Sequence, residues 1–227
     1  MVANRFTAED EAILGAAAEL DGRGILSASG HGNISIRRPD DGEIHYTAHP
    51  SLRTLKGEHI ARLSADGEVL SGIMPPLSAD AARMHLAVYQ TRPEVNCVIH
   101  THSPFATSYA VAGRPIECWA EPLSIFGMSN GVPLVPYAYR GSDEAVRLVA
   151  EWCSGEHVHA VLLQNHGVLS FGTTPAMAVQ FATLVEEAAQ LGIQAMALGG
   201  PIVLPASPGE SRASPAHVRN SEEKRHE

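Results

Sequence analysis

Residues 89–103 read YQTRPEVNCVIHTHS and join the end of a helix to a strand. Apolar residues recur at helical spacing over 80–91, and Pro93 ends this helix because proline disfavours a helical conformation in the residue before it. The apolar run that follows predicts a short strand over 96–102. This stretch therefore places a helix directly before a buried strand, which is the alternation expected of an α/β protein.

Three histidines lie at the ends of predicted strands. His100 and His102 are two residues apart, and because side chains two apart on a strand share a face, both imidazoles can converge on one point. His166 lies between two apolar runs, 160–163 and 168–171, which we interpret as buried strands. The three imidazoles are therefore candidates for one metal site.

The number of ligands indicates what kind of metal site this is. Three neutral imidazoles leave coordination positions for water or substrate, whereas structural zinc sites normally fill all four positions with protein ligands. After His166, Gly167 permits a tight turn and a close approach of the backbone. The pattern favours a catalytic metal site, and the alternative is a set of ordinary hydrogen-bonded histidines at strand ends.

Capping signals place the remaining helices. Thr7 and Asp10 resemble a capping box before apolar residues at helical spacing, which predicts a helix over 8–23. Three further N-cap candidates, two of them followed by proline at the first helical position, predict helices over 103–111, 142–152 and 174–198.

The segments 33–37 and 43–47 alternate polar and apolar residues around the turn sequence PDDG, which predicts a β-hairpin. Strands and helices thus alternate through most of the chain, and the expected class is α/β. A length of 227 residues suits one domain, expected over 1–205. Residues 206–227 are rich in proline, serine and charge, which predicts a flexible C-terminal tail, with a lid over a site as an alternative.

The composition narrows the class of partner. Sixteen Lys and Arg against 25 Asp and Glu give a net charge of −9, which disfavours nucleic-acid binding. No apolar run approaches the roughly 18 to 20 residues of a membrane span, and the first residues lack a signal region, so we expect a cytoplasmic protein without a membrane partner. The cysteines Cys97, Cys118 and Cys153 lack the spacing of a disulfide framework or zinc knuckle. A small-molecule substrate is the expected partner.

Three motifs, GNISIR at 32–37, YQTRPEVNCVIHTHS at 89–103 and QNHG at 164–167, together resemble the class II aldolase/adducin family over about residues 7–198. The resemblance implies a central, mostly antiparallel β-sheet flanked by helices in three layers, and a homotetramer with sites at subunit interfaces. It also implies one divalent metal ion per subunit, held by His100, His102 and His166. Three nitrogen ligands suit Zn, Mn, Fe or Co without choosing among them.

One departure from the family's sugar-phosphate aldolases concerns the proton-transfer carboxylate. In those enzymes a glutamate lies four residues before a histidine that matches His85, and here that position holds Ala81. Asp80 is one residue away, but one residue rotates a helical side chain by about 100°. Asp80 therefore substitutes only if the helix start shifts, and its alternative role is to cap free amides in the first turn.

A second departure concerns phosphate. Related aldolases hold it with a TPSG loop, a pair of serines and the Gly-Asn turn, whereas this chain has TAHP at 47–50 and Ala79-Asp80 in place of the serines. Proline has no amide proton, and a carboxylate repels a phosphate dianion. Both departures favour a branch that resembles decarboxylases of hydroxylated aromatic or heteroaromatic acids, because loss of CO2 needs no base to deprotonate an aldol hydroxyl.

Polar and aromatic residues near these motifs are candidates for further roles. The expected catalytic residues are His31, His49, Asp80 and His85. The expected substrate-binding residues are Asn33, Arg53, Arg83 and Tyr137, with Arg140 and Tyr139 as further candidates. The alternatives are surface histidines, arginines paired with neighbouring acids, and aromatic side chains that pack in the core or at subunit contacts.

The sequence leaves several functions open within this resemblance. A metal-dependent decarboxylase is the expected function. An aldolase that acts on a hydroxy-carbonyl or sugar-phosphate substrate, with Asp80 as its carboxylate, is the main alternative. A sugar isomerase or epimerase and a non-catalytic, adducin-like assembly module are two others. Retention of all three candidate metal ligands disfavours the assembly module.

Overall fold

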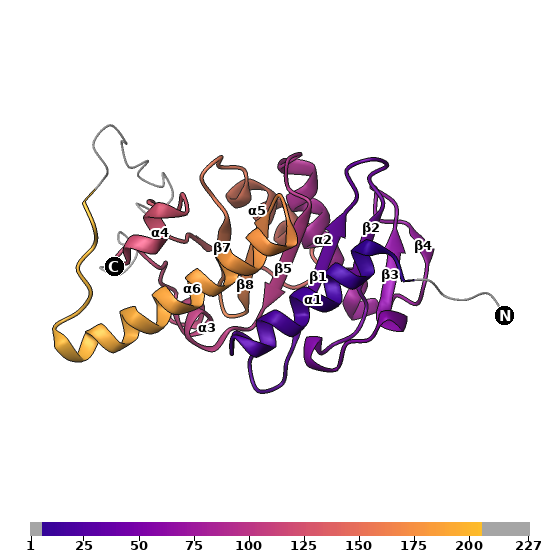
Figure 1. Ribbon diagram of the computed structural model, residues 1–227. Helices are drawn as coiled ribbons and strands as arrows, with labels where there is room; N and C mark the ends of the chain where they lie inside the picture. Colours follow the sequence, from indigo (N-terminus) through magenta and orange to yellow (C-terminus); the bar gives the residue numbers. More distant parts are fainter. Residues whose placement is uncertain (1–5, 206–227) are drawn as a thin grey trace.

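The computed structural model describes residues 6–205. The strands in this part of the chain are β1 (Gly32–Arg37), β2 (Ile44–Thr47), β3 (Ile60–Leu63), β4 (Val69–Ser71), β5 (Cys97–Thr101), β6 (Leu134–Val135), β7 (Ala160–Leu163) and β8 (Gly167–Gly172). They form one sheet in the order β4-β3-β2-β1-β5-β8-β7-β6 (Figure 1). Neighbouring strands are antiparallel except for β6 and β7, which are parallel. The tail expected over 206–227 lies outside the described residues.

Helices cover both faces of this sheet. They are α1 (Ala8–Gly22), α2 (Pro76–Thr91), α3 (Pro104–Val111), α4 (Glu121–Ile125), α5 (Asp143–Cys153) and α6 (Pro175–Ala195). Apolar side chains of α1, α3 and α6 pack on one face, and those of α2 and α5 pack on the other. The mostly antiparallel, three-layer α/β architecture is therefore confirmed. None of the helices within 6–205 is long and apolar enough to cross a membrane.

The strands β7 and β8 are buried along their whole length. On β7, Val161 and Leu163 join the core formed with α2 and α5, whereas Ala160 and Leu162 join the core formed with α6. Because successive side chains of a strand point to opposite faces, a strand covered on both faces has a continuous apolar sequence. The prediction of two buried strands on either side of the QNHG turn is confirmed.

The expected N-caps form at three helices. Thr7 Oγ1 accepts a hydrogen bond from the Asp10 amide at 3.2 Å, and Asp10 Oδ2 accepts one from the Thr7 amide at 3.0 Å. Ser142 and Thr174 each accept a hydrogen bond from the amide three residues on. At the far end of α6, a short 3-10 turn stops at Gly199, where φ is +104° and glycine is favoured.

Two sets of elements differ from the sequence-based expectation. The helix expected from residue 80 begins four residues earlier, with Pro76 at its first position, where proline is tolerated because that amide needs no partner. The elements β3, β4, β6 and α4 were not expected. β4 is exposed throughout and β6 has only two residues, so neither carries a periodic pattern that distinguishes it from a loop.

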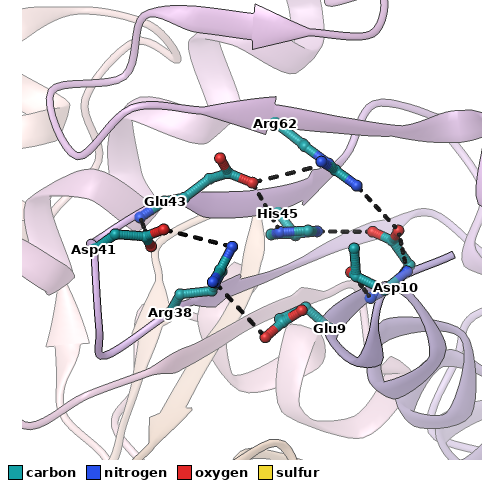
Figure 2. A network of polar contacts seen from close by, with 8 residues as sticks. Glu9, Asp10, Arg38, Asp41, Glu43, His45 and Arg62 are labelled. Carbon is teal, nitrogen blue, oxygen red and sulfur yellow. Dashed lines mark hydrogen bonds and ion pairs between the residues drawn. The ribbon is translucent and has the colours of Figure 1, made fainter. Parts of the chain in front are cut away.

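The buried His45 joins the sheet to the start of α1 (Figure 2). Its Nδ1 lies 2.7 Å from Asp10 Oδ1, and its Nε2 lies 3.2 Å from Glu43 Oε1. Arg62 approaches the same two carboxylates at 3.9 and 3.8 Å. Burial raises the pKa of Asp10, but hydrogen bonds from Thr7 and His45 outweigh burial and hold this pKa below its ordinary value. The network thus fixes α1 against β2 and β3.

Candidate metal centre

The turns at the ends of β5 and β7 bring the three predicted histidines together. His100 is in β5, His102 follows this strand directly, and His166 lies in the turn between β7 and β8. One ligand atom from each histidine lies within 4.8 Å of the other two. Among the described residues, this cluster of potential metal ligands contains no carboxylate or thiol.

The distances between ring nitrogens suit a shared ion. The Nε2 atoms of His100 and His102 are 3.1 Å apart. Two ligands about 2.05 Å from a tetrahedral metal are separated by about 3.3 Å, so one ion can bind both atoms. His100 Nδ1 lies 2.9 Å from the Val168 carbonyl oxygen, and donation to this oxygen leaves the Nε2 lone pair for a metal.

Burial keeps the three imidazoles in the form that binds metal. Burial holds the pKa of His100 well below its ordinary value, and the neighbouring His166 and His102 lower it further. Burial also lowers the pKa of His102, and it lowers the pKa of His166 to about 4, with the Arg140 guanidinium adding to both shifts. Neutral imidazoles at pH 7 need not lose a proton to bind a cation. The donor set therefore fits one divalent metal ion with open positions.

Gly167 provides the space that the rings occupy. A Cβ atom on this residue would lie 2.5 Å from the Thr101 carbonyl oxygen and 2.9 Å from His102 Cδ2. The close approach expected from the sequence is thus confirmed. The left-handed backbone conformation of the turn is adopted by Asn165, with φ of +58°.

The helix α6 supports the turn that carries His102. Ser103 occupies the expected N-cap position of α3, but its hydroxyl lies 2.6 Å from Thr101 Oγ1 and does not cap the helix. Two free amides at the start of α3 instead donate to the Glu186 carboxylate at 2.9 and 2.8 Å. No local sequence pattern predicts this contact, because the residues lie 80 or more positions apart.

Neither Asp80 nor Ala81, both in α2, belongs to the histidine cluster. Ala81 is buried in the core between α2 and the sheet. Asp80 lies beside Gly141 in the loop before α5. A Cβ atom on Gly141 would be 2.7 Å from Asp80 Cγ. The first turn of α2 contains no acidic residue, so the interpretation of Asp80 as a first-turn cap is wrong. The earlier helix start moves Asp80 into the second turn without joining it to the histidines.

The two loop histidines occupy different surroundings. The exposed ring of His31 lies edge-on to His102, with ring centroids 6.1 Å apart. His49 instead stacks on His59, with centroids 4.1 Å apart. His31 therefore lies beside the histidine cluster, whereas the ring of His49 contacts that of His59. Their catalytic roles stay predictions.

The partly exposed Asn33 and the buried His85 form a hydrogen-bonded pair beside His100. Asn33 is opposite His100 in the pairing of β1 with β5, so the two side chains share a face of the sheet. Asn33 Oδ1 lies 2.6 Å from His85 Nε2, and His85 Nδ1 lies 2.7 Å from Ser35 Oγ. His85 is only 1% exposed, and both of its ring nitrogens contact protein groups. The catalytic role expected of His85 stays a prediction.

The two arginines expected to bind substrate both bind protein groups. Arg53 donates to the Asp21 carboxylate at 2.8 Å. Arg83 donates to the Gly141 carbonyl and the Asp143 carboxylate, both at 2.5 Å, and so ties α2 to the start of α5. The alternative that Arg83 pairs with a neighbouring acid is confirmed, while substrate binding by either arginine stays a prediction.

A cavity of about 270 Å³ lies beside His166. Tyr137 and Arg140, both expected to contact substrate, line it together with Gln164 and Asn165 from the turn before β8. The remaining lining is apolar and consists of Met84, Val135, Pro136, Ala138, Ala145, Val149 and Leu163. These apolar lining residues were not predicted from the sequence, because they come from four separate segments of the chain.

Comparison with known proteins agrees with this fold. L-fuculose phosphate aldolase of Escherichia coli O6:H1 is 32% identical over 171 residues, which cover 75% of this chain and 76% of that protein. The 5-deoxy-D-ribulose 1-phosphate aldolase of Bacillus thuringiensis is 30% identical over 208 residues, which cover 90% and 93%. A solved structure of L-fuculose 1-phosphate aldolase superposes with a TM-score of 0.79 at 26% identity, covering 88% of this chain and 92% of the other.

The match also extends to the family as a whole. The sequence pattern of the Class II Aldolase and Adducin N-terminal domain matches residues 11–193, which include all three clustered histidines and every strand of the sheet. The chain therefore belongs to the class II aldolase and adducin family.

Proposed function

We propose that this protein is a metal-dependent carbon–carbon lyase that decarboxylates a hydroxylated aromatic or heteroaromatic acid. The observation that carries the proposal is a three-histidine cluster, without a carboxylate among the described residues, beside a largely apolar cavity. A divalent ion held by His100, His102 and His166 would supply electrostatic stabilisation for the electron pair left when a carbon–carbon bond breaks.

The lining of the cavity supports an aromatic acid as the substrate. Apolar side chains can cover the faces of a ring, and the Tyr137 ring adds an aromatic wall. Arg140 can bind a carboxylate in bidentate fashion. A sugar phosphate would bring several hydroxyl groups against this apolar surface, and hydroxyls buried without partners destabilise a complex.

Side chains around the histidine cluster would orient the substrate acid and supply one proton. In the reaction, the bond between ring carbon and carboxylate breaks, CO2 leaves, and the electron pair stays on the ring carbon until a proton arrives. His31 is the proposed proton donor, because it is exposed and lies beside His102. The Asn33 amide would donate to a substrate oxygen near His100.

An aldolase is the second candidate, and the named activities of the two relatives favour it. In that reaction Asp80 would have to supply the carboxylate that Ala81 lacks. The position of Asp80 beside Gly141, outside the histidine cluster, disfavours this role. For either reaction we propose a homotetramer with sites at subunit interfaces, as the family resemblance implies.

The test is a comparison of products. Protein loaded separately with Mn, Zn, Fe or Co would be given a panel of ortho-hydroxylated aromatic acids and, in parallel, sugar phosphates. The proposal predicts metal-dependent CO2 from at least one acid and a loss of more than about tenfold in turnover for Arg140→Gln. Asp80→Asn is the matched control and should retain activity.

Aldehyde from a sugar phosphate, without CO2 from any acid, would instead establish the aldolase. In that case Asp80→Asn should abolish turnover. The two reactions are therefore separated both by their products and by which variant fails.

A further inference from the structure

His31 lies between two glycines that hold its backbone beside the histidine cluster. Gly30 has φ of +67°, and a Cβ atom on it would lie 2.7 Å from Ser51 Oγ. A Cβ atom on Gly32 would lie 2.6 Å from the His100 carbonyl oxygen. His31 itself forms an isolated β-bridge with Ser51. The backbone around His31 is therefore fixed against the loop at Ser51 and against the strand that carries His100.

The register of the sheet places the His31 side chain on the same face as the cluster. In the antiparallel pairing of β1 with β5, Gly32 lies opposite Thr101, so the next position outward sets His31 opposite His102. Residues opposite each other in an antiparallel pair share a face, and so do residues two apart on a strand. His31 and His102 therefore lie on the face that carries His100. The edge-on contact of the His31 and His102 rings agrees with this placement.

The ring nitrogens of His31 make no hydrogen bond to another residue within 6–205. Two neighbouring histidines differ in this respect. Both ring nitrogens of His85 contact protein groups, and His49 Nδ1 accepts a hydrogen bond from the Ser51 amide at 3.2 Å. The anchored backbone of His31 thus carries a ring whose lone pair is left for a partner outside the described chain.

The spacing of the rings suits His31 as a further ligand of the same ion. Two imidazoles on one tetrahedral ion have ring centroids about 5.2 Å apart when each nitrogen lies about 2.05 Å from the metal. The three rings of the cluster are between 4.7 and 5.1 Å apart. The His31 ring is 6.1 Å from that of His102, so a rotation about its side-chain bonds that closes about 1 Å brings it to this spacing.

We propose that His31 is a fourth, replaceable ligand of the ion held by His100, His102 and His166. In the substrate-free protein His31 fills an open coordination position, and it gives up this position when an anion with two chelating oxygens binds. Among the cluster and its neighbour, no described carboxylate or thiol competes for the position. His31 is the ligand that leaves, because its side chain is exposed whereas the other three are buried or partly buried.

This inference deepens the proposed function and rests on its metal centre, but it does not depend on which acid is decarboxylated. Displacement of His31 leaves its imidazole next to the bound anion, where the proposed function places the proton donor. The position of His31 is thus blocked in the substrate-free protein and becomes available only when a chelating anion has bound.

The first test counts the histidines bound to the ion in the full-length protein without substrate. Protein with 15N-labelled histidine would be loaded with 113Cd, because each ring nitrogen that binds this ion shows a nitrogen–cadmium coupling. The ring nitrogens are observed through carbon-bound ring protons, which do not exchange with water. We expect four coupled histidines in the unchanged protein and three in His31→Ala. Three coupled histidines in both proteins would overturn the proposal.

The second test measures metal affinity by competition with a chelator. Loss of a ligand should weaken binding at least as much as loss of an outer-shell partner, so His31→Ala should lower zinc affinity about tenfold or more. His157→Ala is the matched control, because His157 is exposed and lies outside the cluster, and its affinity should be unchanged. Equal zinc affinity in His31→Ala and the unchanged protein would contradict the proposal.

The third test addresses replacement and uses acetohydroxamate, a small anion with two chelating oxygens, as the probe. Its addition to the 113Cd-loaded protein should remove the coupling of His31 and leave those of His100, His102 and His166. If all four couplings persist until acetohydroxamate strips the ion from the protein, His31 is not replaceable.

The three tests separate this inference from the proposed reaction. Four coupled histidines without CO2 from any aromatic acid would leave the fourth ligand in place and overturn only the reaction. CO2 release with three coupled histidines would do the reverse. A protein that binds no divalent ion would overturn the metal centre and this inference together, and this result is distinct from an ion bound by three histidines. If His31→Ala fails to fold, the number of coupled histidines in the unchanged protein decides.

Discussion

At the scale of single residues, the clustering of three histidines was the most predictable part of the site. His100 and His102 share a strand face through local geometry alone, and Gly167 marks a close approach in the sequence. The surroundings of His85 and Asp80 were not predictable. They depend on where α2 begins and on which strands pack beneath it, and neither is a local property.

Gly167→Ala tests how much space the cluster needs. The added Cβ would lie 2.5 Å from the Thr101 carbonyl oxygen and 2.9 Å from His102 Cδ2, so the ring or the backbone must shift. We expect metal affinity to fall by about tenfold or more, measured by competition with a chelator.

The matched control for this substitution is Gly15→Ala. A Cβ at Gly15 meets nothing within 4 Å, and the residue is on an exposed position of α1. It should keep full metal affinity and gain about 0.5–1 kcal/mol of unfolding free energy, because alanine favours a helix over glycine. Unchanged metal affinity in Gly167→Ala would contradict the packing described for the cluster.

At the scale of elements, Glu186 connects α6 to the turn that carries His102. Its buried carboxylate accepts from both free amides at the start of α3, and burial raises its pKa although these amides lower it in part. Glu186→Ala should lower the unfolding free energy by about 1–2 kcal/mol and also weaken metal binding. Denaturant unfolding and metal titration measure the two effects.

The neighbouring Glu187 is the control for this prediction, because it is exposed on the same helix. Glu187→Ala should change neither stability nor metal affinity appreciably. Glu186→Gln keeps one acceptor oxygen and should fall between the two. A Glu186→Ala protein that binds metal as tightly as the unchanged protein would limit the role of Glu186 to stability.

The contact between Asp10 of α1 and His45 of β2 predicts that the free energy of unfolding depends on pH. The folded pKa of Asp10 lies below its ordinary value, so its ionised form is favoured by folding. Its contribution is complete above the unfolded pKa of about 4 and is lost as the pH falls through the lower, folded pKa. Asp10→Asn should therefore cost about 1–2 kcal/mol at pH 7, and this difference should shrink as the pH falls from 5 toward 3.

Unfolding by denaturant at several pH values checks this prediction. The measured quantity is the difference in unfolding free energy between Asp10→Asn and the unchanged protein, so the titration of other carboxylates cancels. A difference that stays constant or grows toward acid pH would contradict the link between Asp10 and His45.

At the scale of the whole molecule, the family fold and its three layers were predictable, but the full sheet was not. The apolar runs of β5, β7 and β8 and the helix caps carry strong local patterns. β4 and β6 are short and take their conformation from the strands beside them, so only tertiary contacts define them. The cavity beside His166 could not be predicted for the same reason.

The proposed assembly is a prediction at this scale. Apolar side chains near the end of α6 are exposed in the single chain, with Leu198 at 90% and Ile202 at 86%. Light scattering on purified protein should give about four times the chain mass of 24.1 kDa. A mass equal to that of one chain would contradict the homotetramer and place the complete site within a single subunit.

The most direct test of the account is the metal content of His102→Ala. The chain should bind about one divalent ion after metal removal and reloading, because three imidazoles and no other described ligand form the cluster. His102→Ala should lose both this ion and turnover, whereas His157→Ala, at an exposed position outside the cluster, should keep them. A folded His102→Ala protein that retains one ion per chain and full turnover would contradict the metal centre and the function built on it.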